Sequence, residues 1–300
     1  MRILITGATG FIGRALVAEA RRRDHAVVAL SRDPERAKDA LRGARVLGWD
    51  PMSGPLPPGV TEGIDAVIHL AGENVGAGRW TRKRMAAIRA SRVAGTANVV
   101  ESVARSRPRV FVCASATGWY GHRGDEVLTE ESPAGHDFLA GVCRAWEAEA
   151  EKAVAHGVRC VRVRTGVVLG KGGGALDKML TPFRMNVGGR LGSGKQWMSW
   201  IHLDDIVGLF LHAAETPSIA GPMLGVSPLP VTNREFTRTL GRTLGKWTFL
   251  PMPGFMLRVV VGKMAEVLLG SQRCDPTVAK RTGYAFRYPT LEGALRQIFA

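Results

Sequence analysis

Cysteine is scarce in this 300-residue sequence, and its placement excludes two common kinds of site. The four cysteines, Cys113, Cys143, Cys160 and Cys274, have no CxxC spacing, and none of the seven histidines clusters with them. Zinc sites are recognised by such spacing, and four scattered cysteines do not give the pattern of a disulfide framework. We therefore expect neither a metal centre nor a disulfide-stabilised scaffold.

A long uninterrupted apolar run is also missing. The most apolar long stretch, residues 255–269, is broken by Arg258, Lys263 and Glu266, well short of the ~20 residues that span a bilayer. The first six residues, MRILIT, predict a strand and lack the pattern of a secretory signal. We expect a cytoplasmic protein without a membrane partner. Residues 254–269 are most simply interpreted as a core helix, although a lone apolar helix can also form an interaction surface.

Acidic residues are few: 26 Asp and Glu stand against 41 Lys and Arg, which gives a net charge of +15. Such an excess would attract polyanions. The basic runs at residues 21–23 and 82–84 are short and scattered, without a helix-turn-helix pattern nearby. We interpret the charge as solvated surface and expect no nucleic-acid partner. With 45% hydrophobic residues, the composition excludes a mainly disordered chain.

Short β-branched runs alternate with helical stretches through the first half of the chain. Strands are predicted at residues 2–6, 26–31, 45–48, 66–70, 109–114 and 160–164. This alternation predicts a Rossmann-type, doubly wound parallel sheet of the α/β class. After Gly166, glycine-rich stretches and short helices indicate a smaller C-terminal lobe. We place a nucleotide-binding domain at residues 1–167 and a substrate-binding lobe at residues 168–300, with residues of about 197–228 returning to the first domain.

Three glycines follow the first predicted strand at the spacing GxxGxxG. Gly7 is expected to make the tight turn, Gly10 to let a pyrophosphate approach the backbone, and Gly13 to allow close helix packing. The start of the following helix would add NH groups and the positive end of its dipole. This turn therefore predicts a dinucleotide site formed by Gly7, Thr9, Gly10, Phe11, Ile12 and Gly13.

The end of the second predicted strand favours a phosphorylated dinucleotide. NAD-binding proteins usually place an acidic residue here for the ribose hydroxyls, whereas this chain has Ser31 and Arg32. A guanidinium can hold a 2′-phosphate through two hydrogen bonds, so NADP(H) is preferred over NAD(H). Alternatively, the next residue, Asp33, could face the ribose. The further predicted cofactor-binding residues, which follow the third and fourth strands, are Asp50, Leu70, Ala71 and Gly72.

These motifs resemble the short-chain dehydrogenase/reductase superfamily. Its extended members have a TGxxGxxG turn like residues 6–13 and an HLAG-like strand end like residues 69–72. The resemblance implies an NADP(H)-binding reductase or epimerase-like enzyme that acts on a carbonyl or hydroxyl substrate. Further stretches that resemble the subgroup named for nucleoside-diphosphate-sugar epimerases are residues 72–74, 79–81, 91–96, 164–170, 200–205 and 230–236.

The resemblance also implies a catalytic Tyr with a Lys four positions later, the Lys lowering the Tyr pKa and holding the nicotinamide ribose. The expected helix, within residues 137–151, contains neither residue type. The two positions fall on Phe138 and Val142, or, with the register shifted by one, on Leu139 and Cys143. The standard dyad is therefore absent.

Other side chains must supply any catalysis. Ser115, Thr117 and Tyr120 are the predicted catalytic residues, because they lie at and just after the end of the fifth predicted strand, where open α/β sheets bind ligands. Ser115 or Thr117 could hydrogen-bond a substrate carbonyl. Tyr120 could act as an acid, although the resemblance favours a packing role. Cys143 is a weaker candidate nucleophile, and from the second lobe Lys195 and Gln196 are expected to face the cleft.

Two classes of function follow. The preferred one is an NADP(H)-dependent oxidoreductase or epimerase-like enzyme with a non-standard proton donor and an unidentified small-molecule substrate. The alternative is a catalytically silent module whose NADP(H) occupancy regulates a protein partner, which the missing dyad motivates. The sequence predicts no oligomeric state.

Overall fold

The computed structural model describes residues 1–248 and 250–300. Its main feature is a seven-stranded sheet in the order β11-β7-β5-β4-β1-β2-β3, in which every neighbouring pair is parallel. This order confirms the predicted doubly wound fold, and the six predicted strands are present with ends shifted by no more than two residues. The strands are β1 (Arg2–Thr6), β2 (Ala26–Ser31), β3 (Arg45–Gly48), β4 (Ala66–His69), β5 (Val110–Ala116), β7 (Arg159–Thr165) and β11 (Gly221–Gly225).

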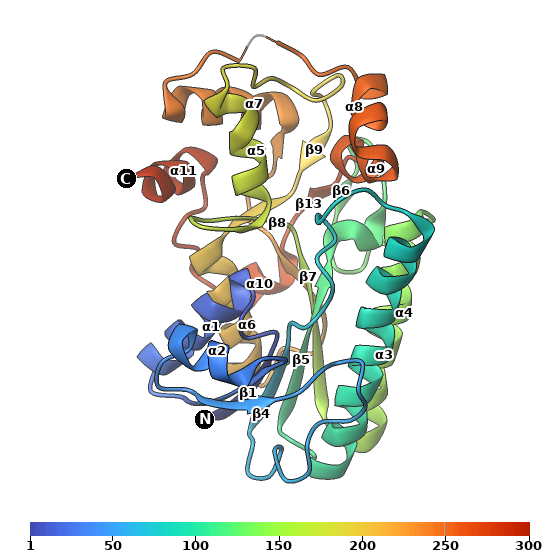
Figure 1. Ribbon diagram of the computed structural model, residues 1–300, viewed down its shortest axis with the longest axis vertical. Coiled ribbons are helices and arrows are strands. Elements are labelled where there is room, and N and C mark those ends of the chain that lie inside the picture. The colour runs from blue at the N-terminus through green and yellow to red at the C-terminus, as the bar shows by residue number, and fades with distance from the viewer. Residues whose placement is uncertain (249) are drawn as a thin grey trace.

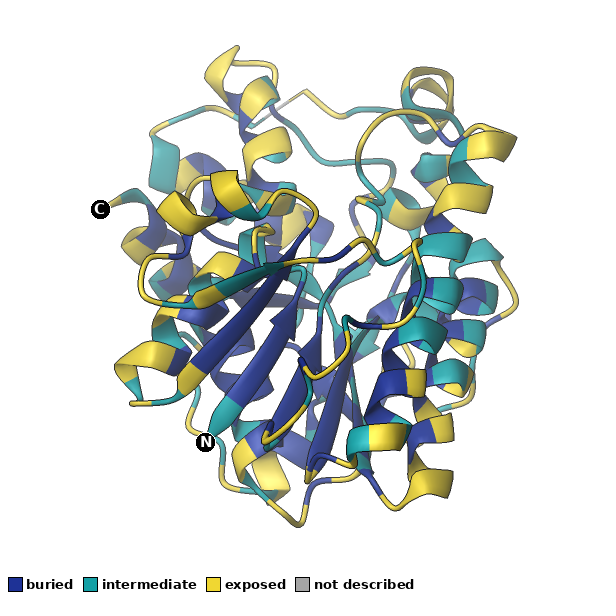
Figure 2. Cartoon of the chain, turned by 60° about the horizontal axis from the view of Figure 1, so that its bottom comes forward, coloured by how far each residue is buried: buried dark blue, intermediate teal, exposed yellow. Residues whose placement is uncertain are grey.

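Helices cover both faces of the sheet, because successive side chains of the strands point to opposite faces and are apolar on both. Ile3 and Ile5 pack toward one layer of helices, while Leu4 packs toward the other. The strands are consequently buried on both faces, as Figure 2 shows. The first layer contains α1 (Phe11–Arg22), α2 (Pro34–Ala40), α6 (Leu203–Glu215) and α10 (Thr277–Arg281), and the second contains α3 (Arg82–Ser106) and α4 (Phe138–Glu151) (Figure 1).

A second lobe stands above the carboxyl ends of the strands (Figure 1). Its core includes Leu176, Trp200, Leu240 and Leu295, all fully buried or nearly so. The chain crosses back to the sheet in this region, because α6 packs against α1 and β11 pairs with β7. The lobe contains β8 (Val167–Leu169), α5 (Gly174–Arg184), β9 (Trp197–Met198), β10 (Trp200–His202), β12 (Val231–Thr232), α7 (Asn233–Leu244) and α11 (Leu291–Phe299).

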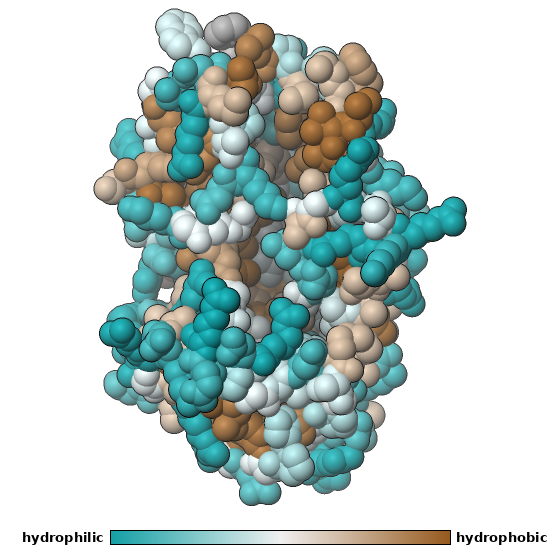
Figure 3. Space-filling view, viewed as in Figure 1, coloured by the Kyte–Doolittle hydropathy of each residue, from teal (hydrophilic) through white to brown (hydrophobic). Residues whose placement is uncertain are grey.

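The apolar stretch at residues 254–269 is not a core helix, so that interpretation was wrong. It forms α8 (Gly254–Val261), the short 3-10 turn Gly262–Met264 and α9 (Ala265–Leu269). Only Leu257 of α8 is buried, whereas Phe255 and Val259 are 68% and 71% exposed. Figure 3 shows the resulting apolar surface at the upper right. In the described part of the chain, no helix is both long and apolar enough to cross a membrane.

Two further short strands, β6 (Val127–Leu128) and β13 (Arg273–Cys274), pair in parallel and join the two lobes. Between β5 and β6, the chain forms the 3-10 turn η1 (Thr117–Tyr120). A second 3-10 turn, Lys152–His156, extends α4. This arrangement brings the loops that follow β1, β2, β4 and β5 to one edge of the sheet, facing the second lobe.

Candidate functional site

The glycine turn between β1 and α1 fits tightly against the end of β4. Gly7 has a φ of +67°, a conformation that favours glycine, and a Cβ atom there would lie 2.7 Å from the backbone nitrogen of Ala71. A Cβ at Gly13 would lie 2.2 Å from the backbone oxygen of Gly7. Both positions therefore exclude any side chain, and the first turn of α1 rests directly on the loop.

The start of α1 is left open for an anion. Gly10 is the N-cap residue, no side chain caps the helix, and its first turn contains no acidic residue. By contrast, α2, α3 and α4 begin with the side-chain caps Asp33, Thr81 and Asp137. The first NH groups of α1 thus remain available, at the positive end of the helix dipole.

Phe11 joins this turn to the second lobe. Cβ atoms placed on Gly170, Gly173 and Gly174 would lie 2.9, 2.7 and 2.8 Å from its ring. The glycine-rich loop after β8 therefore fits around the ring because it carries no side chains there. Ile12 is half-buried and packs against the core beneath α1, while Thr9 is exposed and its carbonyl accepts a hydrogen bond from Arg14.

The contacts made after β2 show whether Arg32 or Asp33 is available to the ribose end of a cofactor. Asp33 caps α2, with its Oδ1 accepting from the backbone nitrogen of Arg36 at 3.1 Å, and buried Ser31 donates to the backbone oxygen of Asp33. Arg32 is exposed and makes no ion pair or hydrogen bond with any other described residue. The free group at this edge is therefore the guanidinium. Asp50, after β3, accepts from the backbone nitrogen of Met52.

The end of β4 is held by a buried hydrogen-bond relay. The backbone nitrogen of Ala71 donates to Thr6 Oγ1, and Thr6 Oγ1 lies 2.6 Å from His69 Nδ1. The other ring nitrogen of His69, Nε2, has no hydrogen-bond partner among the described residues. Burial lowers the pKa of His69 to about 3, so the ring is neutral. The Leu70 nitrogen also donates to the Thr6 backbone oxygen, so Thr6 holds the backbone of Leu70 and Ala71, which precede Gly72 in the stretch where a cofactor is predicted to lie.

The predicted catalytic residue Ser115 is already engaged. Its hydroxyl donates to Glu147 Oε1 on α4 at 2.6 Å, and the same carboxylate accepts from Arg164 Nε and Nη2 at 2.9 and 3.0 Å. All three residues are 3% exposed. Sequence reasoning missed Glu147, and its position within the helix expected to carry the dyad was the available signal. The geometry assigns Ser115 to a buried ion-pair network.

Tyr120 belongs to the same network. Its hydroxyl donates to the backbone oxygen of Thr129 and accepts from Arg164 Nη1, both at 2.9 Å. The side chain is fully buried, and burial raises the pKa of the phenol well above its ordinary value. These contacts support the packing role. Thr117 differs, because its hydroxyl has no hydrogen-bond partner among the described residues, which leaves it free for a ligand.

Leu139 and Cys143, the second pair of positions considered for the missing Tyr and Lys, lie on the face of α4 that packs against β5 and η1. A Cβ at Gly118 would lie 3.2 Å from Leu139 Cβ, and Cys143 Sγ lies 3.8 Å from the backbone oxygen of Ala116. In contrast, Phe138 packs edge-on against Trp80. Burial raises the pKa of the Cys143 thiol to about 12, so the thiol stays protonated and is a poor nucleophile.

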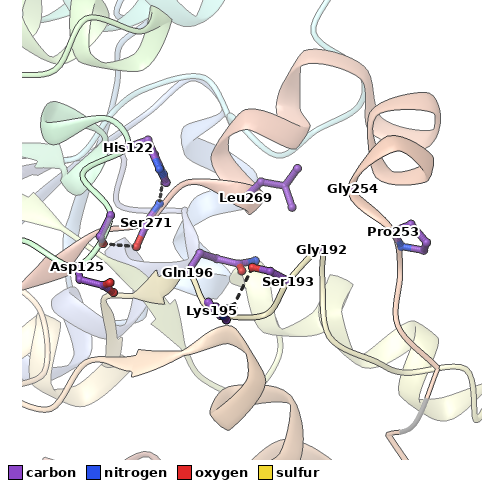
Figure 4. Close-up of a pocket in the computed structure, with 11 residues that line it drawn as sticks. His122, Asp125, Gly192, Ser193, Lys195, Gln196, Pro253, Gly254, Leu269 and Ser271 are labelled. Carbon is purple, nitrogen blue, oxygen red and sulfur yellow. Dashed lines mark hydrogen bonds between the residues drawn. The ribbon is translucent and has the colours of Figure 1, made fainter.

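A cavity of about 520 Å³ opens where the second lobe meets the loop after η1 (Figure 4). Lys195 and Gln196 both line it, and Gln196 is anchored by a hydrogen bond to the backbone oxygen of Leu191. On the opposite wall, His122 Nδ1 accepts from the backbone nitrogen of Ser271 at 3.1 Å, which leaves Nε2 as a donor. His122 was missed because nothing in its local sequence marks it. The other lining residues are Gly124, Asp125, Gly192, Ser193, Pro253, Gly254 and Leu269.

Comparisons with known proteins give the chain its family. Residues 3–222 match the model of the NAD dependent epimerase/dehydratase family, and residues 252–298 match a domain of unknown function. The chloroplastic homologue of epimerase family protein SDR39U1 from Arabidopsis thaliana is 41% identical over 302 residues, covering 99% of this chain and 86% of the relative. Epimerase family protein MT2273 from Mycobacterium tuberculosis is 38% identical, covering 98% and 96%.

A solved structure agrees with these relatives. The crystal structure of human epimerase family protein SDR39U1 (isoform 2) with NADPH has a TM-score of 0.88 and 35% sequence identity, and the match covers 99% of each chain. The resemblance seen in the motifs is thereby confirmed over the full length. This chain belongs to the NAD dependent epimerase/dehydratase family.

Proposed function

We propose that this protein binds NADP(H) and acts as a reductase or epimerase-like oxidoreductase on a small carbonyl or hydroxyl compound. The observation that carries the proposal is the unpaired guanidinium of Arg32 beside the open start of α1, with the neighbouring Asp33 committed to capping α2. A 2′-phosphate is the part of the cofactor that such a guanidinium recognises. The human relative crystallised with NADPH supports the same choice.

The residues present fit this cofactor. Gly7 and Gly13 leave no side chain in the turn, so the pyrophosphate can approach the NH groups of α1. Arg32 would hold the 2′-phosphate at the end of β2. The bound cofactor supplies the hydride chemistry, while the protein positions the cofactor and the substrate.

The substrate would occupy the hollow between the lobes, which Figure 3 shows along the middle of this face. Thr117 has a free hydroxyl at the end of β5, and His122 offers Nε2 in the cavity of about 520 Å³. These two groups are our candidates for orienting and protonating a substrate oxygen, in place of Ser115 and Tyr120. A cytoplasmic location stays a prediction, since the Arabidopsis relative is chloroplastic.

Calorimetric titration with NADPH and NADH tests the cofactor. We expect wild-type protein to prefer NADPH, and Arg32→Asp to weaken NADPH binding by at least about tenfold with little change for NADH, because charged hydrogen bonds to the 2′-phosphate are lost. Arg42→Asp, an exposed position beyond α2, is the matched control. Equal weakening of both cofactors by Arg32→Asp would contradict the proposal.

A second function deserves a test because Ser115 and Tyr120 are both held in the buried network. On this alternative, the protein is a catalytically silent NADP(H) sensor whose occupancy controls a protein partner. Steady NADPH consumption with a panel of ketones and aldehydes supports the enzyme. Tight NADPH binding without turnover, together with a pull-down that changes on NADPH saturation, supports the sensor.

A further inference from the structure

Arg92, in the middle of α3, reaches the carboxyl end of β4. Its Nη1 donates to the backbone oxygens of Glu73 and Ile88 at 3.0 and 3.2 Å. A Cβ at Gly72 would lie 3.5 Å from its Cζ, and Cζ itself lies 5.1 Å from the centre of the Trp146 ring. The guanidinium therefore lies beside the HLAG turn, along which the cofactor is predicted to run.

The charge of Arg92 has no carboxylate partner among the described residues. The side chain of Glu73, whose backbone oxygen Arg92 contacts, forms its ion pair with Arg84 at 2.7 Å. The remaining donors of Arg92, Nε and Nη2, make no hydrogen bond with a described residue. Arg92 is half-buried, and with two unused donors and no carboxylate partner it can take a polar or anionic group from outside the chain.

Arg92 packs against α4 through the ring of Trp146, three residues after Cys143. Burial keeps the Cys143 thiol protonated and His69 neutral, so neither side chain supplies a charge in this part of the structure. Cys143 occupies one of the two positions expected for the missing lysine. Arg92 is thus a cation from α3 in the neighbourhood where related enzymes have a cation from the helix after β5.

We propose that Arg92 binds the nicotinamide ribose of NADP(H), and so performs the positioning task of the absent lysine. In a doubly wound sheet, a dinucleotide crosses the point where the strand order reverses, here between β1 and β4. Its adenine half then lies toward β2, at Arg32, and its nicotinamide half toward β4 and β5, at Arg92. This inference rests on the NADP(H) site proposed above.

Two ligands can distinguish binding in the nicotinamide half of the site from binding in the adenine half. NADPH contains the nicotinamide ribose, whereas adenosine 2′,5′-bisphosphate lacks it but keeps the 2′-phosphate. By calorimetry, Arg92→Met should weaken NADPH by about tenfold to a hundredfold and leave the bisphosphate within about twofold of wild type. Arg92→Lys should restore part of the NADPH affinity. The control is Arg89→Met, an exposed position on the same helix, and we expect it to change neither ligand.

These titrations distinguish a failure of the Arg92 inference from a failure of the proposed NADP(H) site. Arg92→Met with wild-type NADPH affinity overturns the inference, and so does equal weakening of both ligands, because a folding defect would explain it. If Arg92→Met does not fold, Arg92→Gln provides the same comparison. Wild-type protein that binds neither ligand overturns the proposed function itself, whereas bisphosphate binding that Arg92 does not influence leaves the NADP(H) site intact.

Discussion

At the carboxyl edge of the sheet, polar groups are unpaired on one side, around β1 and β2, and paired with one another on the other side, around β5 and β7. Around β1 and β2, the NH groups that open α1 and the guanidinium of Arg32 have no protein partner in the described chain. Around β5 and β7, Ser115, Glu147, Arg164 and Tyr120 satisfy one another in the buried interior. Open polar groups in a crevice await a ligand, whereas paired buried ones maintain the fold. Ser115 and Tyr120, two of the three predicted catalytic residues, thus lie in a network that links structural elements.

The largest effect is expected from Arg164→Met, which leaves the Glu147 carboxylate buried without its cation. We expect the free energy of unfolding to fall by about 3–5 kcal/mol in urea titrations. Arg105→Met, which breaks an exposed pair with Glu101, should cost no more than about 1 kcal/mol. If Arg164→Met lowers the free energy of unfolding as little as Arg105→Met does, the network around Glu147 does not maintain the fold.

The next largest effect is expected from a substitution in the glycine turn between β1 and α1. In Gly13→Ala the new Cβ would lie 2.2 Å from the Gly7 backbone oxygen, so we expect a loss of about 1–3 kcal/mol in stability and of detectable NADPH binding by calorimetry. Gly141→Ala, in α4, meets nothing within 4 Å and should stabilise the protein by about 0.5–1 kcal/mol. Normal NADPH affinity in Gly13→Ala would mean that the turn does not carry the pyrophosphate.

His69 lies between the two sides and should appear in the pH dependence of stability. Its folded pKa of about 3 is below the ordinary 6.5, so the unfolded chain binds more protons between these values. Stability should therefore fall on acidification from pH 6.5 toward 3, by up to about 1.4 kcal/mol per pH unit from this group. His202 and His212, whose pKa values are also lowered by burial, add to the slope. His69→Gln should flatten the slope relative to wild type; an unchanged slope would exclude His69 as its source.

The smallest effect is expected from Tyr120→Phe. Loss of the hydroxyl removes the hydrogen bonds to Thr129 and Arg164, so stability should fall by about 1–2 kcal/mol, with NADPH affinity and any turnover unchanged. Thr117→Val, measured alongside, should instead reduce turnover. Abolished turnover in Tyr120→Phe at normal stability would restore the phenol as the acid.

Local patterns predicted much of this molecule. The six strands and the Gly7 to Gly13 turn follow from periodicity and spacing within short windows, and the structure has them where they were expected. The seventh strand, β11, was missed because its identity depends on pairing with β7, some 60 residues away. The apolar composition of α8 suggested burial, but burial depends on what packs against a helix.

The residues of the candidate site likewise divide into those that a short stretch of sequence could predict and those that it could not. The exposed place of Arg32 directly after β2 could be predicted from the sequence, while its role in binding a 2′-phosphate stays a prediction. The pairing of Ser115 with Glu147, and of Glu147 with Arg164, joins three separate elements, and no single stretch of sequence records it. Arg92 and His122 likewise gain their significance only from neighbours distant along the chain, Gly72 and Ser271 respectively.

The aromatic ring of Phe11, lodged among three residues that have no side chains, has a mechanical consequence. The first turn of α1 and the loop after β8 are in close contact through this ring, which restricts movement of the second lobe relative to α1. A shift at the start of α5 would therefore press on the backbone expected to hold the phosphates. We expect a ligand bound in one lobe to affect the position of the other.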